Sequence, residues 1–193
     1  MKKIIALLLA AVMLTLTISL VSCGGTKDPD EGSSKYKNSL ELFNKIWGTY
    51  TDDEKFPVGG GDEDHNSDEG PGVVDIEKYK DTIMFWTHIT EDLLGTVTND
   101  AANLMHMMNT NTFSSAIFHL KDAKTAESFA KDYNSAIMGT RWICGSPERV
   151  LVISVDEYVI VAFGYAELTD TFKAKCLAVD TSAKLLIDNA IEE

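Results

Sequence analysis

The sequence predicts an α+β fold in which amphipathic helices cover a small, mostly antiparallel sheet of three strands, with four strands as the alternative. Two observations carry this prediction. Residues 149–155 and 158–163 are apolar, β-branched runs separated by only two acidic residues, a pattern typical of a β-hairpin. Before them, a strand-like run at 113–120 is followed by a helical pattern at 122–139. From residue 113 onward the predicted order is strand, helix, strand, strand, helix.

The elements of this second half follow from their apolar spacing. Residues 113–120 (FSSAIFHL) form the first strand, and both hairpin strands are apolar at nearly every position, so we expect both of their faces to be covered. Between the strand 113–120 and the hairpin, apolar residues recur at helical spacing from Ala126 to Ile137. This predicts an amphipathic helix that Asp122 caps and Gly139 ends.

The first half of the domain is predicted to begin with a helix. Residues 39–50 (SLELFNKIWGTY) place four apolar side chains at i, i+3, i+6 and i+7, and Ser39 is a suitable N-cap. Residues 74–87 (VDIEKYKDTIMFWT) also show a helical stripe. Their β-branched and aromatic residues fit a strand as well, so both interpretations stay open there.

Two more helices are predicted around this framework. Asp100 is a suitable cap for a short helix over residues 101–109 (AANLMHMMN). Apolar residues from Leu168 to Ile187 trace a long C-terminal helix, which the polar residues 180–182 (DTS) bend or restart.

The first residues resemble the export signal of bacterial lipoproteins. Lys2 and Lys3 precede an uncharged apolar stretch, Ile4 to Leu20, and the signal ends in Leu-Val-Ser-Cys. In that family the cysteine carries diacylglycerol and the signal is cleaved before it. The resemblance implies that Cys23 is lipidated and that its acyl chains anchor the protein in the bilayer.

The chain is therefore expected to have three parts. Residues 1–22 are the lipoprotein signal peptide, and residues 23–35 are the lipidated cysteine with a flexible spacer that lacks hydrophobic residues. Residues 36–193 form a single α+β domain, long enough for a sizeable core, with an acidic, glycine-rich loop at 51–73.

The formal net charge of −13 limits the classes of partner. Nucleic acids and anionic lipid surfaces select basic patches, so we expect no nucleic-acid partner and no peripheral binding to anionic lipid. Soluble ligands, cations and cationic peptides stay compatible with this charge.

Cys144 and Cys176 remain after Cys23 has been assigned to lipid. An exported protein with two such cysteines invites a disulfide, but their spacing is not a CxxC redox motif. The alternative, which we favour, is two buried thiols that behave as small hydrophobic groups.

The acidic loop is the most suggestive stretch for binding. KFPVGGGDEDHNSDEGPG combines five acidic residues, five glycines and a histidine over residues 55–72. Because its glycines precede acids, it would repel phosphate rather than bind it. We interpret it as an exposed, solvated contact loop, with EDHNSDEGPG as its mobile half.

The alternative for this loop is a weak calcium or other cation site. Its candidate ligands supply oxygen atoms at nearly alternating positions: Asp62, Asp64, Asn66, Asp68 and Asp75. An EF-hand that begins at Asp64 fails, because its sixth position is Glu69 rather than glycine and its twelfth is an aspartate.

Other chemistry finds little support in the sequence. His106 and the methionines beside it suggest a soft-metal site, but on a helix these neighbours would face different directions. A nucleophilic pair of Cys144 with His106 or His119 is conceivable, although the sequence does not show their proximity. The chain has no GxSxG, HExxH or Walker motif and no recognised cofactor motif.

Several blocks of the mature chain resemble a group of uncharacterised lipoproteins encoded by anaerobic, mostly Gram-positive gut bacteria. These blocks are LMHMMN with the TF that follows it, WICGSP, a hairpin of the form VDxYVI, and ELxDTFK; LFNKIWGTY and DEKFPVGGGD are similar to the same group. The resemblance implies a location at the outer face of a cytoplasmic membrane. It also implies that the FPVGGGD part of the acidic loop is attached to the domain. It brings no catalytic residues with it.

The sequence thus predicts a lipid-anchored extracytoplasmic lipoprotein at the cell membrane, a non-catalytic module that binds an envelope protein or a soluble ligand. The weak cation-binding module is the first alternative. An extracytoplasmic hydrolase with an unrecognised site is the second.

Overall fold

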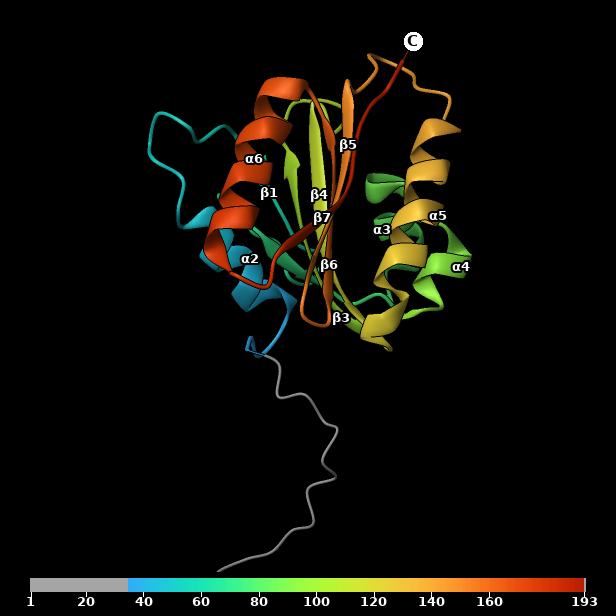
Figure 1. Ribbon diagram of the computed structural model, residues 1–193. Coiled ribbons are helices and arrows are strands. Elements are labelled where there is room, and N and C mark those ends of the chain that lie inside the picture. Colours follow the sequence, from blue (N-terminus) through green and yellow to red (C-terminus); the bar gives the residue numbers. More distant parts are fainter. Residues whose placement is uncertain (1–34, 193) are drawn as a thin grey trace, which may run out of the picture. The chain divides into compact units, whose positions relative to one another are not determined.

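The computed structural model describes residues 35–192, which form one compact unit (Figure 1). The predictions for the signal peptide, for Cys23 and for most of the spacer lie outside these residues. The helices are α2 (Ser39–Trp47), α3 (Lys80–Thr87), α4 (Glu91–Leu94), the 3₁₀ turn η1 (Ala123–Thr125), α5 (Ala126–Met138) and α6 (Ala166–Val179). The strands are β1 (Val58–Gly59), β2 (Gly72–Val74), β3 (Val97–His106), β4 (Phe113–Leu120), β5 (Arg149–Val155), β6 (Tyr158–Gly164) and β7 (Lys184–Ala190).

The seven strands of residues 35–192 belong to one antiparallel sheet in the order β1-β3-β4-β6-β5-β7, and β2 also pairs with β3. The predicted α+β class and the mostly antiparallel sheet are confirmed. The predicted number of strands, three or four, is wrong. The additional strands come from the acidic loop region and from segments for which helices were predicted.

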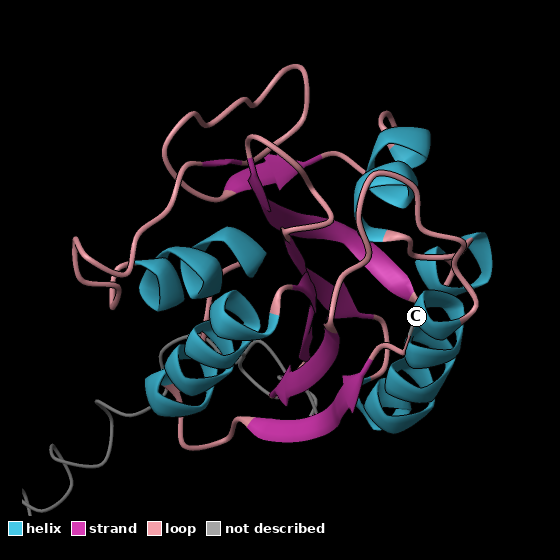
Figure 2. Ribbon diagram, turned by 90° about the horizontal axis from the view of Figure 1, so that it is seen from above, coloured by secondary structure: helices cyan, strands magenta, loops and turns pink. Residues whose placement is uncertain are grey.

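Helices cover the sheet on both sides, and Figure 2 shows α2 and α6 on one side and α3, α4 and α5 on the other. Each side has its own apolar cluster. Phe118, Phe129 and Tyr133 are among the fully enclosed side chains of the α5 side, and Phe43, Phe113 and Phe172 belong to the α2–α6 side. The hairpin strands β5 and β6 contribute alternately to both clusters, which confirms that they are covered on both faces.

Residues 101–109 were predicted to be helical, and residues 97–106 form β3 instead. Leucine, methionine and alanine favour helices, but successive side chains of this segment contact opposite apolar clusters: Ala101 on one side, Ala102 and Leu104 on the other. Burial on both faces therefore outweighs intrinsic propensity. Asp100 caps no helix here; its carboxylate accepts hydrogen bonds from the Ser39 N–H at 3.0 and 3.1 Å and so holds the start of α2.

The long C-terminal helix was also predicted incorrectly beyond residue 179. Helix α6 ends at Val179, and after a turn the chain returns as β7, which pairs with β5. Asp180 causes this break, because its carboxylate accepts a hydrogen bond from the Ser182 N–H at 2.8 Å and stabilises a turn in place of a helix.

The segment 74–87, which the sequence left open, is divided between both structures. Val74 ends β2, and α3 begins only at Lys80. Ser39 was predicted to cap the first helix, but the N-cap of α2 is Asn38, whose side chain accepts a hydrogen bond from the Glu41 N–H. Other predictions hold: α2 lies within 39–50, β4 spans 113–120, Asp122 caps η1 ahead of α5, and the C-cap of α5 is Gly139.

Asp180 also joins the start of the described chain to the turn between α6 and β7. Its carboxylate accepts a hydrogen bond from the Tyr36 hydroxyl at 2.5 Å and pairs with Lys35 Nζ at 2.7 Å. The Tyr36 ring packs edge-on against Tyr158. The described chain therefore enters the domain at the end of the sheet where β6 begins. The acidic loop lies toward the opposite end, where Val58 pairs with His106.

Candidate functional site

The acidic loop is built around the buried carboxylate of Asp62. One carboxylate oxygen accepts hydrogen bonds from the backbone N–H groups of Asp64 and His65, both at 3.0 Å, and lies 2.8 Å from His65 Nδ1. The other accepts from the Asp75 N–H at 2.7 Å. Burial acts to raise the pKa of Asp62, but these hydrogen bonds outweigh burial and lower it. Asp62 therefore organises the loop as an ionised acceptor.

Three glycines let the loop pack tightly against the sheet. A Cβ atom on Gly60 would lie 2.5 Å from the Asn103 carbonyl oxygen and 2.5 Å from the Gly72 nitrogen. One on Gly72 would lie 2.4 Å from the Gly61 nitrogen. Asn103, which is fully buried, accepts a hydrogen bond from the Gly61 N–H at 2.5 Å. The glycine run thus serves close backbone packing.

The EDHNSDEGPG segment was predicted to be the mobile half of the loop, and it is instead tied to the domain. Gly60 and Ser67 exchange two backbone hydrogen bonds of 2.8 Å, and Trp47 Nε1 donates to the Glu69 carbonyl at 3.2 Å. The sequence indicated attachment only for FPVGGGD. The aromatic partner of the second half lies in a distant helix, which sequence spacing does not reveal.

The other candidate ligands for a cation point to different partners. Asp64 pairs with Lys78 at 2.5 Å, and this ammonium group lowers the pKa of the Asp64 carboxyl. Asn66 donates to Asp68 at 2.5 Å, and one oxygen of Asp75 accepts from the Lys78 N–H at 3.1 Å. Within residues 35–192, no group of three or more His, Cys, Asp or Glu side chains is arranged to hold a metal ion.

A cleft of about 390 Å³ opens between this loop and α3. Trp86 and Met105 provide its apolar wall, and Gly59, Gly60, Gly61, Asp62, Glu63 and Asn66 provide the loop side. Three exposed acidic side chains of the same loop, Glu63, Asp68 and Glu69, form no ion pair within the described residues. We call these three residues the acidic rim. The arrangement suits a ligand that joins an apolar body to a positive charge.

Within residues 35–192, the cysteines and histidines do not form a nucleophilic pair. Cys144 and Cys176 are both free; Cys176 is buried as expected, whereas Cys144 is exposed, contrary to the favoured prediction. No hydrogen bond in the described part of the chain joins the Cys144 thiol to a histidine. His119 lies instead between Asp100 and Glu157, 3.6 and 3.1 Å from their carboxylates.

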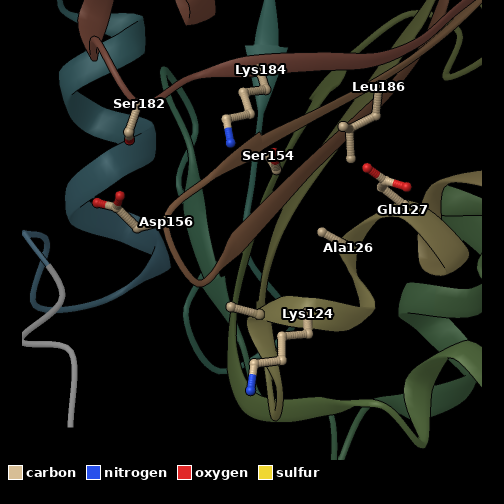
Figure 3. A pocket seen from close by; sticks show the side chains of 9 residues that line it. Lys124, Ala126, Glu127, Ser154, Asp156, Ser182, Lys184 and Leu186 are labelled. Atoms are coloured by element: carbon tan, nitrogen blue, oxygen red, sulfur yellow. The ribbon is translucent and has the colours of Figure 1, made fainter. Parts of the chain in front are cut away.

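A second hollow, which sequence reasoning missed, lies between β7 and α5 (Figure 3). It has a volume of about 340 Å³, and its lining includes Lys124 and Glu127 near the start of α5 and Lys184 and Leu186 of β7. Figure 3 shows the Lys184 and Leu186 side chains above Ser154, with Glu127 facing Leu186. Because residues 184–187 were predicted to be helical, no sequence pattern indicated this hollow.

Comparisons with known proteins add no functional assignment. In residues 35–192, no helix has both the length and the apolar character needed to cross a bilayer. Searches against protein-family models, curated proteins and solved structures find no match to this chain.

Proposed function

We propose that the protein is a lipid-anchored extracytoplasmic binding module that engages a cationic segment of an envelope protein through its acidic loop. One observation carries this proposal: the loop is fixed by the buried Asp62 carboxylate, and Glu63 of its acidic rim lines a cleft with an apolar wall. A contact loop that is already ordered loses little conformational entropy on binding. Carboxylates around the cleft attract a cationic partner and select against anionic ones.

The cleft walls define the chemistry of the preferred segment. Trp86 and Met105 offer an aromatic ring and a flexible thioether to an apolar side chain, and a lysine or arginine beside that side chain reaches the acidic rim. Loop and wall come from different elements, with Gly59 opposite Met105 in the β1–β3 pairing. The recognition surface therefore depends on the folded domain.

The cation-binding alternative is less well supported by this geometry. The two oxygens of Asp62 already accept four hydrogen bonds, and Asp64 is occupied by Lys78. A calcium site needs six or more oxygen ligands that converge on one point. These carboxylates would have to leave their present partners to provide them.

The anchor is tested by the change Cys23→Ala. Loss of the thiol removes the acceptor for diacylglycerol, so we expect labelling with a radioactive fatty acid to disappear and the protein to leave the membrane fraction. Cys144→Ala is the matched control and should keep both labelling and membrane association. Labelled Cys23→Ala protein would contradict the lipoprotein assignment.

The acidic rim is tested by charge reversal. We expect the triple variant Glu63→Lys, Asp68→Lys, Glu69→Lys to bind a fluorescent peptide of alternating lysine and leucine at least about tenfold more weakly than the wild type. The measurement is fluorescence anisotropy at physiological salt, with the acylated protein in nanodiscs of uncharged lipid and empty nanodiscs as background.

A matched control separates the loop from overall charge. The triple variant Asp92→Lys, Asp132→Lys, Glu167→Lys changes the net charge equally at exposed sites on three helices. It should retain affinity within about threefold, because charges beyond a Debye length of about 8 Å are largely screened. Equal losses in both variants would show that the peptide responds only to net charge, and the proposal would fail.

A further inference from the structure

Strand β7 ends the sheet and has one open edge. It pairs with β5 on one side, and within residues 35–192 no strand pairs with its other side. In Figure 2 the sheet ends in this strand between the ends of α5 and α6. The Ile191 N–H donates to the Glu148 carbonyl of the β5 side at 2.9 Å. Because successive residues of a strand direct their N–H and C=O groups to opposite edges, the backbone groups of Asp188 and Ala190 point to the open edge.

A groove accompanies this edge on the α5 side. The hollow of about 340 Å³ is continued by a second one of about 270 Å³, and the two share Glu127 and Leu186 in their linings. Leu185, Leu186, Ile187 and Ala130 give the second hollow an apolar floor. The side chain of Leu185 is 41% exposed, so this apolar surface is accessible. A free strand edge beside a helix provides both backbone hydrogen-bonding groups and side-chain pockets.

The charges along the groove differ from those of the rest of the protein. Lys124, Lys131 and Lys184 line it, and none of them forms an ion pair within the described residues. Glu127 and Asp156 are the two acidic lining residues. In a chain of net charge −13, three unpaired ammonium groups along one groove favour a segment that carries carboxylates.

We infer that β7 and α5 together capture an extended segment of a partner protein, which adds to the sheet as a further strand. Its backbone pairs with Asp188 and Ala190, and the side chains that face α5 are apolar and acidic. This inference goes beyond the proposed function, since it uses a different surface and requires neither the anchor nor the acidic loop.

The pairing in β7 limits the length of such a strand. Its register to β5 shifts between Val152 and Ile153, which leaves Leu186 as a bulged residue. A bulge interrupts a regular ladder, so the incoming segment has a regular edge only over 187–190. A short edge of this kind can accept one segment while it resists edge-to-edge aggregation. Specificity then depends on the side chains that enter the groove.

The decisive variant is Ala190→Pro. Proline removes an N–H that points away from β5, and its ring obstructs the open edge, while the hydrogen bonds to β5 are kept. The probe is a fluorescent peptide of alternating valine and glutamate, measured by anisotropy with the full chain. We expect at least about tenfold weaker binding by Ala190→Pro and unchanged binding by Ala190→Ser, which keeps the N–H.

A second measurement does not depend on the folding of a variant. The same peptide with N-methyl groups on alternate amides keeps its charge. The methyl groups remove the N–H donors along one of the two edges of the extended peptide, so only the other edge can pair with a strand. Two such peptides exist, one methylated on the valine amides and one on the glutamate amides. Wild-type protein should bind one of them and fail to bind the other. Equal binding of both methylated peptides, or equal binding by Ala190→Pro and wild type, would show attraction by charge alone and overturn the inference.

Absence of binding by the wild type would also overturn the inference, since β7 would then be only a blunted edge. The triple charge reversal of the acidic rim separates this result from the proposed function. It should leave binding of the valine–glutamate peptide intact, because the rim lies beside β1 and β3, at the opposite margin of the sheet from β7.

Discussion

Replacing Asp62 with alanine is expected to lower the free energy of unfolding by about 3 kcal/mol and to release the acidic loop from the domain. The change leaves the N–H groups of Asp64 and Asp75 without their acceptor, whereas the His65 N–H keeps its hydrogen bond of 3.2 Å to the carbonyl of residue 62. An orphaned buried donor costs about 1–3 kcal/mol, and partial access to water at the loop surface reduces the total. Urea unfolding measures the loss, and amide hydrogen exchange in residues 60–70 measures the release.

The loss should depend on pH in a defined direction. The pKa of Asp62 is lower in the folded protein than the value of about 4 for an unfolded aspartate. A depressed carboxyl pKa stabilises the folded state above the unfolded pKa, and this contribution disappears as the pH falls through the folded pKa. The difference between wild type and Asp62→Ala should therefore be largest above pH 5 and shrink toward pH 2.

Asp64→Ala is the matched control for Asp62. Asp64 is an exposed carboxylate two residues away whose ion partner is also exposed, so its loss should change stability far less than the loss of Asp62 does. If both alanine variants were equally stable, Asp62 would not be the organising residue of the loop. The main argument for an ordered contact surface would then fail.

Gly60→Ala should be comparably severe, with a loss of about 3 kcal/mol, for a purely steric reason. The added Cβ would lie 2.5–2.7 Å from three backbone atoms, which belong to Asn103, Gly70 and Gly72. Backbone atoms cannot move aside as the end of a flexible side chain can, so β1 or the loop must shift relative to β3. Thermal unfolding measures the loss, and anisotropy with the lysine–leucine peptide reports the accompanying change in the cleft.

The adjacent glycine provides a sharp comparison. At Gly59 the nearest atoms to an added Cβ are the Ser67 carbonyl oxygen at 3.5 Å and Met107 Cγ at 3.9 Å, which are ordinary contacts. Gly59→Ala should therefore change stability by less than about 1 kcal/mol. A loss in Gly59→Ala as large as in Gly60→Ala would indicate that backbone entropy, rather than close packing, explains the glycine run.

Local patterns predicted the elements whose packing agrees with their propensity. The helix that starts near Ser39, the strand 113–120, the hairpin and the helix from Ala126 to Met138 all have spacing that matches their burial. The errors concern segments in which tertiary contacts oppose local preference. AANLMH favours a helix and forms a central strand, because apolar clusters lie on both of its faces.

The candidate sites were less predictable than the fold, because they depend on contacts between distant segments. The acidic loop was found from composition alone, but the role of Asp62 depends on Asp75, and the attachment of the loop depends on Trp47. The β7–α5 groove could not be predicted, since it requires Leu186 to be in a strand. Only the polar residues at 180–182 hinted that the helix stops there.

The contact of Tyr36 and Lys35 with Asp180 has a mechanical consequence. Any pull on the chain before residue 35 enters the domain at this point, where the residues just before α2 meet the turn between α6 and β7. The acidic loop lies toward the other end of the strands, beside residues 105 and 106 of β3. A load between the two points would run along the strands, across ladder hydrogen bonds that stand perpendicular to them. Such a load would shear many hydrogen bonds of the sheet at once. The domain should therefore resist a pulling force better than if the force separated the strands one hydrogen bond at a time.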